Sequence, residues 1–165
     1  MPSSPSSLAL VVFAVVTAFG CASQAPPRSE DQPKMVARTT FQGKGVPNGR
    51  SDSTEPFLRL QATATDATYG HTPANPIKVG GFRTRLGSTR EKMYLNALMG
   101  ANGQPIEYER LGSCCAFSTP NGMQGGGLLD AFRITVQGQR KSSILYLNIY
   151  DEGDLLVPVG FSPRS

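Results

Sequence analysis

The chain has 165 residues, of which 39% are hydrophobic and 17% are charged. Once the N-terminal segment and a proline-rich stretch are set aside, roughly 105 residues remain, which suffices for one modest core and excludes a large barrel enzyme. The net charge of +4 comes from 16 basic and 12 acidic residues that are spread along the chain. Because these residues form no dense Lys/Arg patch, we expect no nucleic-acid partner.

An uncharged, mainly apolar segment occupies residues 8–20 and ends at Cys21, where polar sequence begins. The segment is shorter than the ~20 apolar residues that a membrane-spanning helix needs, and it is typical of the apolar region of a secretory signal peptide. We therefore expect residues 1–20 to be a signal peptide. A buried apolar strand with an incidental cysteine is the alternative.

The residues around Cys21 resemble a bacterial lipobox, in which a small residue precedes a cysteine that is acylated and becomes the new N-terminus. Gly20 and Cys21 fit this pattern, whereas Ala18 stands where Leu is usual and Phe19 is bulky where a small residue is typical. Residues 1–7 also lack the Lys or Arg of a typical signal peptide. Acylated Cys21 would hold the protein in a lipid bilayer through several acyl chains. Ordinary cleavage, which releases a soluble exported protein, remains open.

Residues 22–56 are rich in Pro, Ser, Gly and mixed charge, with few apolar residues and no periodicity. This composition predicts a flexible tether, which together with lipidated Cys21 covers residues 21–56. As a flexible coil, the tether would span ~30 to 35 Å. Residues 35–43 include β-branched and aromatic side chains and are a candidate for an added edge strand.

Residues 57–165 predict one domain, which begins with strand-like segments. Residues 57–65 alternate apolar side chains with Arg, Gln and Thr, which favours a half-buried strand. Residues 76–80 predict a short strand that ends at two consecutive glycines.

A helix is predicted at residues 89–99. Ser88 and Glu91 have the spacing of a capping box at its start, and Gly100 supplies a C-cap. One face of this helix would carry Met93, Tyr94, Ala97 and Leu98.

The remaining elements are strands. Residues 104–111 alternate in polarity, and residues 127–137 and 142–151 form the best hairpin of the sequence. Residues 155–161 predict a final short strand at an edge. The fold class is therefore α+β, with a small, largely antiparallel sheet of four to six strands and one covering helix.

Cys114 and Cys115 are adjacent, and they are the cysteines that the exported domain retains. Adjacent Cα atoms lie ~3.8 Å apart, below the usual range for a disulfide, so a bond between the two would be strained and readily reduced. Three interpretations stay open: two reduced thiols packed as small hydrophobic groups, a vicinal disulfide, or a metal-binding or nucleophilic pair.

His71 is the one histidine of the chain and lies in a turn-like segment. It is therefore the one imidazole that could complement Cys114 and Cys115 in a redox or metal site. The long spacing between His71 and the cysteines carries no metal-binding motif, and an exposed loop histidine is the simpler interpretation.

A glycine-rich loop, Gly125, Gly126 and Gly127, precedes a predicted strand. Loops that bind phosphate instead follow a strand and open a helix, so a β-bulge or a close backbone approach is the simpler interpretation. Asp130 follows within an apolar run, where a buried carboxylate needs partners or a raised pKa. We therefore take the loop and Asp130 as a candidate functional segment.

Several sequence motifs lie within about 95 residues from Tyr69 onward. Among them, LGSCC, TPNG and GGGLLD occur in this order. In these segments the chain resembles a family of small exported bacterial proteins, many of them lipoproteins, which are often labelled 2-dehydro-3-deoxyphosphooctonate aldolase. That chemistry belongs to a (β/α)8 barrel of ~250 residues. The chain has neither that length nor the alternation of strands and helices, and the resemblance transfers no catalytic residue.

These features predict a lipid-anchored protein of the bacterial cell envelope, facing the periplasm from the outer membrane. We expect its domain to bind an envelope protein or a cell-wall component, without catalysis and without a cofactor. The alternative is a thiol- or metal-dependent enzyme, or a metal-binding protein, that uses Cys114, Cys115 and His71. The aldolase activity of the family label is the weakest alternative.

Overall fold

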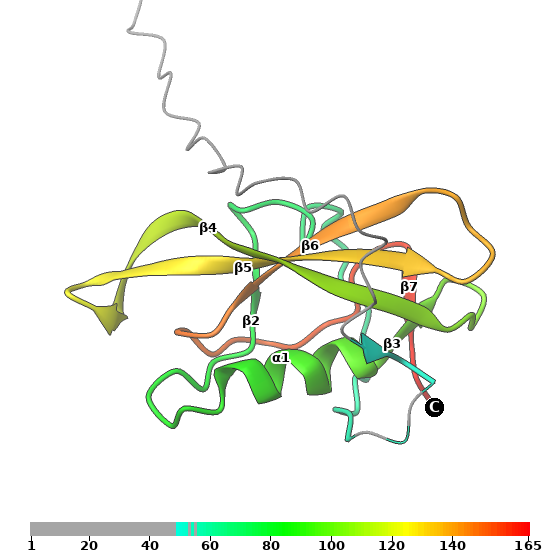
Figure 1. Cartoon of the computed structure of the whole chain (residues 1–165), viewed down its shortest axis with the longest axis horizontal. Coiled ribbons are helices and arrows are strands. Elements are labelled where there is room, and N and C mark those ends of the chain that lie inside the picture. Colours follow the sequence, from blue (N-terminus) through cyan, green and yellow to red (C-terminus); the bar gives the residue numbers. More distant parts are fainter. Residues whose placement is uncertain (1–48, 53, 55) are drawn as a thin grey trace, which may run out of the picture. The chain divides into compact units, whose positions relative to one another are not determined.

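The computed structural model describes residues 49–52, 54 and 56–165. In this part of the chain one helix accompanies a five-stranded, largely antiparallel sheet and a separate two-stranded sheet, which confirms the α+β class (Figure 1). The strand order of the larger sheet is β1-β4-β5-β6-β2, and β2 runs parallel to β6. The strands are β1 (Gly49–Arg50), β2 (Ile77–Lys78), β3 (Leu98–Gly100), β4 (Ile106–Met123), β5 (Gly126–Val136), β6 (Ser142–Asn148) and β7 (Phe161–Pro163).

The expected signal peptide, Cys21 and the candidate strand at residues 35–43 all lie outside the described residues. Within the described ranges, no helix is both long and apolar enough to cross a bilayer.

The helix α1 (Gly87–Asn96) lies along one face of the larger sheet (Figure 1). Its buried face includes Glu91, Tyr94 and Leu95, a spacing that places all three on one side of a helix. The Tyr94 hydroxyl donates a hydrogen bond to the carbonyl oxygen of Leu156 at 2.6 Å. The helix thus packs on the core through an apolar stripe that the carboxyl group of Glu91 interrupts.

The predicted capping box at the start of the helix is wrong. The helix begins at Gly87, its N-cap residue is Leu86, and no side chain caps it. Ser88 therefore lies inside the first turn. Glu91 is 1% exposed, so its carboxyl group is buried in the protein and does not cap the end of the helix.

The predicted end of the helix is also wrong, because the chain leaves the helix to form β3. β3 pairs antiparallel with β7, and Gly100, the expected C-cap, lies opposite Phe161. This pairing satisfies backbone groups that the local sequence assigned to a helix. The smaller sheet therefore connects the end of the helix to the C-terminal segment.

β4 is much longer than the strand expected at residues 104–111, since it continues through the two cysteines to Met123. Its pairing with β5 shifts register at three places. These lie between Arg110 and Gly112, between Cys114 and Ala116, and between Ser118 and Met123. Such bulges bend and twist a strand and change which side chains reach each face.

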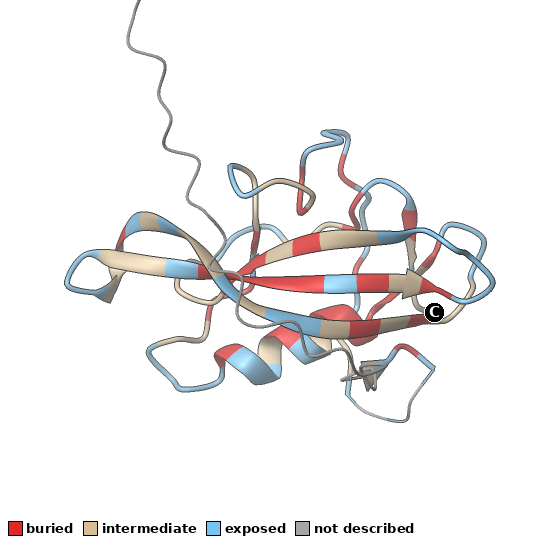
Figure 2. Cartoon of the chain, turned by 45° about the horizontal axis from the view of Figure 1, so that its top comes forward, coloured by how far each residue is buried: buried red, intermediate tan, exposed pale blue. Residues whose placement is uncertain are grey.

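The hairpin expected from residues 127–137 and 142–151 is confirmed as β5 and β6. β6 lies between β5 and β2, and burial alternates along residues 144–147. Leu145 and Leu147 are fully buried, whereas Ile144 and Tyr146 are half-buried. Figure 2 shows that buried residues also run along the middle of β5, so these two strands carry the centre of the core.

The strand predicted at residues 57–65 is wrong, because this segment makes only an isolated bridge between Thr63 and Val157. The backbone nitrogen of Leu58 instead donates to the carbonyl oxygen of Met93 in α1 at 3.0 Å. Leu60 is buried and Leu58 packs against the core. The segment predicted as a strand at residues 155–161 shares that bridge, and the strand β7 begins only at its end.

Residues 21–56 were expected to form the tether, but Gly49–Arg50 pair with β4 as an edge strand. Ser51 is fully buried next to this strand. Its backbone nitrogen donates to the carbonyl oxygen of Ile106 at 3.0 Å, and its Oγ accepts a hydrogen bond from the backbone nitrogen of Ile106 at 2.8 Å. The folded domain therefore includes residues that composition alone gave to the tether.

We predict that Ser51→Ala lowers the free energy of unfolding of the full chain by about 1 to 3 kcal/mol, because it leaves the buried Ile106 amide without an acceptor. The control is Asp52→Ala, which removes an exposed ion pair with Arg50 and should cost at most about 1 kcal/mol. Urea unfolding measures both. Equal, small losses in the two variants would contradict the assignment of Ser51 to the core.

Candidate functional site

Asp130 lies in β5 and is held by an ion pair with Arg110 of the neighbouring strand β4. Nη2 of Arg110 donates to Oδ1 of Asp130 at 2.6 Å, and Nε donates to Oδ2 at 3.1 Å. The Ser113 hydroxyl also donates to Oδ1, at 2.7 Å. Asp130 is 7% exposed, so these charge-assisted bonds form in a protected site. The expectation that a carboxylate in this apolar run needs partners is confirmed.

Glu91 reaches the same place from the helix. It is 1% exposed, and its Oε1 has no hydrogen-bond partner among the described residues. Burial raises the pKa of Glu91, and so do the charge of Asp130 and a hydrogen bond with Asp130; although Arg110 opposes them, the pKa reaches about 8. At neutral pH the Glu91 carboxyl is therefore mostly protonated.

A cavity of about 380 Å³ opens beside Glu91, between the helix and the sheet. Such a volume falls within the range of small-molecule sites. Its walls combine two aromatic rings with groups that carry charge or hydrogen bonds. The lining residues are Ser88, Glu91, Lys92, Tyr108, Arg110 and Phe132.

Secondary structure fixes the positions of these side chains. The Tyr108 hydroxyl donates to Oδ1 of Asn96 at 2.6 Å, which ties β4 to the last residue of α1. Tyr108 and Arg110 alternate onto the helix side of β4. The bulge after Arg110 then allows Ser113 to pair with Asp130 across the two strands. The arrangement can hold a polar ligand between a buried carboxyl group and exposed cations.

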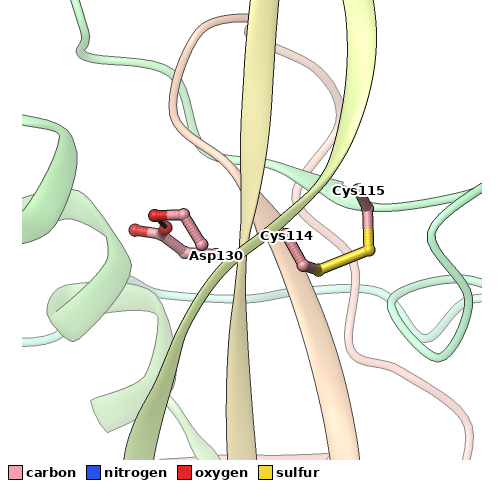
Figure 3. The surroundings of a disulfide bond; sticks show 4 residues. Cys114, Cys115 and Asp130 are labelled. Carbon is pink, nitrogen blue, oxygen red and sulfur yellow. Dashed lines mark hydrogen bonds between the residues drawn. A yellow bond between two sulfur atoms is a disulfide. The ribbon is translucent and has the colours of Figure 1, made fainter. Parts of the chain in front are cut away.

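Cys114 and Cys115 form a disulfide within β4, next to the second bulge. Of the three interpretations that the sequence left open, the structure has the vicinal disulfide. Both residues are half-buried, and Cys115 has a φ of 58°, which places it in the left-handed region. Figure 3 shows the Asp130 side chain on the side of α1 and the disulfide on the other side of the strands. The pair lies within β4, beyond the end of the strand that was expected at residues 104–111.

His71 lies elsewhere in the described part of the chain. Its Nε2 is 3.0 Å from the carbonyl oxygen of Val159, and its ring stacks on Phe161 with centroids 6.1 Å apart. Among the described residues, no group of three His, Cys, Asp or Glu side chains could hold a metal ion. The structure therefore does not bring His71, Cys114 and Cys115 together as a ligand set.

The glycine loop is the tight turn between β4 and β5. Gln124 and Gly125 have φ values of 53° and 78°, as a two-residue hairpin turn requires. Gly127 is constrained by packing, because a Cβ there would lie 2.8 Å from the Tyr150 ring. None of the three glycines lines the cavity beside Glu91. Of this candidate segment, Asp130 alone therefore belongs to the site, through its ion pair with Arg110.

A second cavity, of about 410 Å³, lies near the hairpin tip. Its neighbour Asp151 accepts hydrogen bonds from Thr119, Asn121 and Asn148, which outweigh the effect of burial and lower its pKa. The lining residues are Gly81, Phe82, Arg83, Thr84, Asn121, Tyr150 and Glu152. None of these side chains has a buried polar atom without a partner, so the cavity beside Glu91 is the stronger candidate.

Comparisons with protein families, with curated proteins and with solved structures found no match for this chain. The resemblance to exported bacterial proteins therefore stays a proposal. The segments that carry it meet in space, since Ser113 and Cys114 of LGSCC lie opposite Asp130 and Leu129 of GGGLLD.

Sequence reasoning found Asp130 but missed Glu91 and Arg110. Glu91 was assigned to a capping box, although it shares the helical spacing of Tyr94, Leu95 and Leu98. A carboxyl group within an apolar helical stripe is the signal that could have identified it.

We predict that the unfolding free energy of the full chain falls as pH rises from about 4.5, the ordinary pKa of a glutamate, to about 8. The folded state holds a proton on Glu91 that the unfolded state has lost, so the fall is at most ~1.4 kcal/mol for each pH unit. Glu91→Gln should remove this dependence, and Ser88→Ala, which lines the same cavity, should retain it. Urea unfolding across this pH range measures the slopes, and an unchanged slope in Glu91→Gln would refute the assignment.

Proposed function

We propose that this protein is a lipoprotein of the bacterial cell envelope whose domain binds a small polar ligand. The observation that carries the binding role is the buried carboxyl group of Glu91, which lines a cavity and keeps one oxygen without a partner. A buried acceptor in this state is costly unless a donor reaches it. A ligand with a hydrogen-bond donor would supply that bond.

Features of the sequence support the proposed location. The apolar segment at residues 8–20 and Cys21 support export and acylation, and the resemblance to small exported proteins agrees with them. Anchored through Cys21, the domain would face the periplasm from the outer membrane. Its natural ligand would then be a small polar molecule present in the periplasm, either free or as part of an envelope protein or of the cell wall.

A second candidate function uses the disulfide between Cys114 and Cys115. The adjacency of the two residues favours it, because a ring closed across one peptide bond is more readily reduced than an ordinary disulfide. This disulfide would accept two electrons and two protons from a partner dithiol and become two thiols, while the partner dithiol becomes a disulfide. In this case the protein would act by thiol exchange, and the cavity beside Glu91 would have a structural role.

We predict that Cys21→Ala abolishes incorporation of labelled fatty acid and moves the protein out of the membrane fraction. Cys115→Ala is the matched control and should keep both properties, since Cys115 lies in the folded domain. Fractionation and fatty-acid labelling of cells that produce the full chain measure the result. Continued labelling of Cys21→Ala would contradict lipid anchoring at this residue.

We predict that Cys114→Ala and Cys115→Ala each lower the melting temperature modestly without changing an envelope phenotype that depends on this protein. Thiol counting on the parent protein, before and after reduction, verifies that the disulfide is present. Loss of the phenotype with unchanged melting would favour the second candidate function over the first.

A further inference from the structure

The cavity beside Glu91 contains groups of both charges, and their arrangement limits what it can hold. Arg110 is paired with Asp130 on one side and lines the cavity on the other. The buried Glu91 carboxyl lies at the inner end and the exposed Lys92 at the rim. A simple cation would meet Arg110 and Lys92, and a simple anion would meet the carboxyl group of Glu91. A ligand with one pole of each sign avoids both conflicts.

The inner end of the cavity suits an ammonium group. Oε1 of Glu91 is a buried acceptor without a partner, and an ammonium supplies the donor. The rings of Tyr108 and Phe132 line the same space, and their faces attract a cation. A metal ion lacks support here, because the described residues contain no group of three suitable ligands.

The outer end of the cavity suits a carboxylate. Arg110 uses Nε and Nη2 for Asp130 and Ser113, so its Nη1 has no partner among the described residues. The Arg110 side chain is 43% exposed, and Lys92 next to it is also exposed. Both cations are thus available to a carboxylate that enters from solvent.

The two poles line one cavity, although Glu91 and Arg110 belong to different elements of the fold. The positive charge of Arg110 also acts to lower the pKa of Glu91. An ammonium and a carboxylate on one carbon atom would therefore reach both groups at once. We infer that the cavity beside Glu91 binds a free α-amino acid, with its ammonium at Glu91 and its carboxylate at Arg110 and Lys92. This inference rests on the proposed role as a binding protein and names its ligand.

Binding of an amino acid in this cavity should release a proton from the Glu91 carboxyl. The charged and titratable groups around Glu91 are Asp130 from β5, Arg110 and Tyr108 from β4, and Lys92 from α1. With its pKa near 8, Glu91 is mostly protonated at pH 7 in the free protein. An ammonium beside it favours the ionised form, so the proton passes to the buffer as the zwitterion binds.

The test is calorimetric titration of leucine into the protein purified from membranes in detergent, at pH 7, in two buffers that differ in ionisation enthalpy. We expect leucine to bind and to release about one proton per molecule. Two probes each lack one pole of leucine: isoamylamine has no carboxylate, and 4-methylpentanoate has no ammonium. Each should bind at least about tenfold more weakly than leucine, since each leaves one end of the cavity unpaired.

Variants then assign the two poles. Glu91→Gln should weaken leucine at least about tenfold and abolish proton release. The matched control is Glu109→Gln, which removes a carboxyl group that pairs with Arg133 outside the cavity, and it should bind leucine like the parent. Lys92 is exposed, so Lys92→Gln should fold normally. It should weaken leucine and leave isoamylamine unchanged.

Equal affinities for leucine and 4-methylpentanoate would overturn the amino-acid assignment while retaining a ligand cavity, and with it the proposed function. Leucine binding without proton release, or binding unchanged in Glu91→Gln, would also overturn the assignment. Absence of binding by leucine and alanine, in both enantiomers and at millimolar concentration, would do the same. The proposed location fails by a different result, namely a Cys21→Ala protein that stays acylated in the membrane.

Discussion

Two carboxyl groups meet between the helix and the sheet, and a guanidinium is paired with one of them. Asp130 has Arg110, whereas Glu91 has a buried oxygen without a partner. Like charges at short range in a medium of low dielectric cannot both persist, so the pair needs a proton or another cation. Because the helix places Glu91 beside Asp130, the stability of the fold depends on pH, and a fitting ligand must bring a positive charge to Glu91.

β4 separates two features that the sequence presents as neighbours. Ser113 reaches Asp130 on the helix side, and the next residue, Cys114, belongs to a disulfide on the other side (Figure 3). The alternation of side chains along a strand explains this separation. The bulges on either side of Ser113 set the register in which it occurs. A carboxyl site and a redox-sensitive bond can therefore share one strand without sharing a surface.

Burial contributes differently to the two ends of the helix. Near its C-terminal end, Tyr94 and Leu95 are fully buried and fix the helix to the core. Their one polar side-chain group is the Tyr94 hydroxyl, which is hydrogen-bonded. Toward its N-terminal end, Glu91 brings a carboxyl group to an otherwise similar position. A protein gains no stability from such a group unless it is neutral or paired, which is why buried carboxyl groups often mark functional sites. The helix thus serves both as cover for the sheet and as support for the candidate site.

Local sequence determined the α+β class, the β5–β6 hairpin and the need of Asp130 for partners, because alternation, turn residues and a charge within an apolar run are visible without a structure. The anchor at Cys21 also rests on sequence alone and stays a prediction. Tertiary structure decided the rest. Glu91, Arg110 and Asp130 belong to three elements, and their approach depends on a bulge and on helix packing. Likewise β3 and β7 are strands because they pair with each other across more than sixty residues, and backbone hydrogen bonds over that separation leave no local pattern.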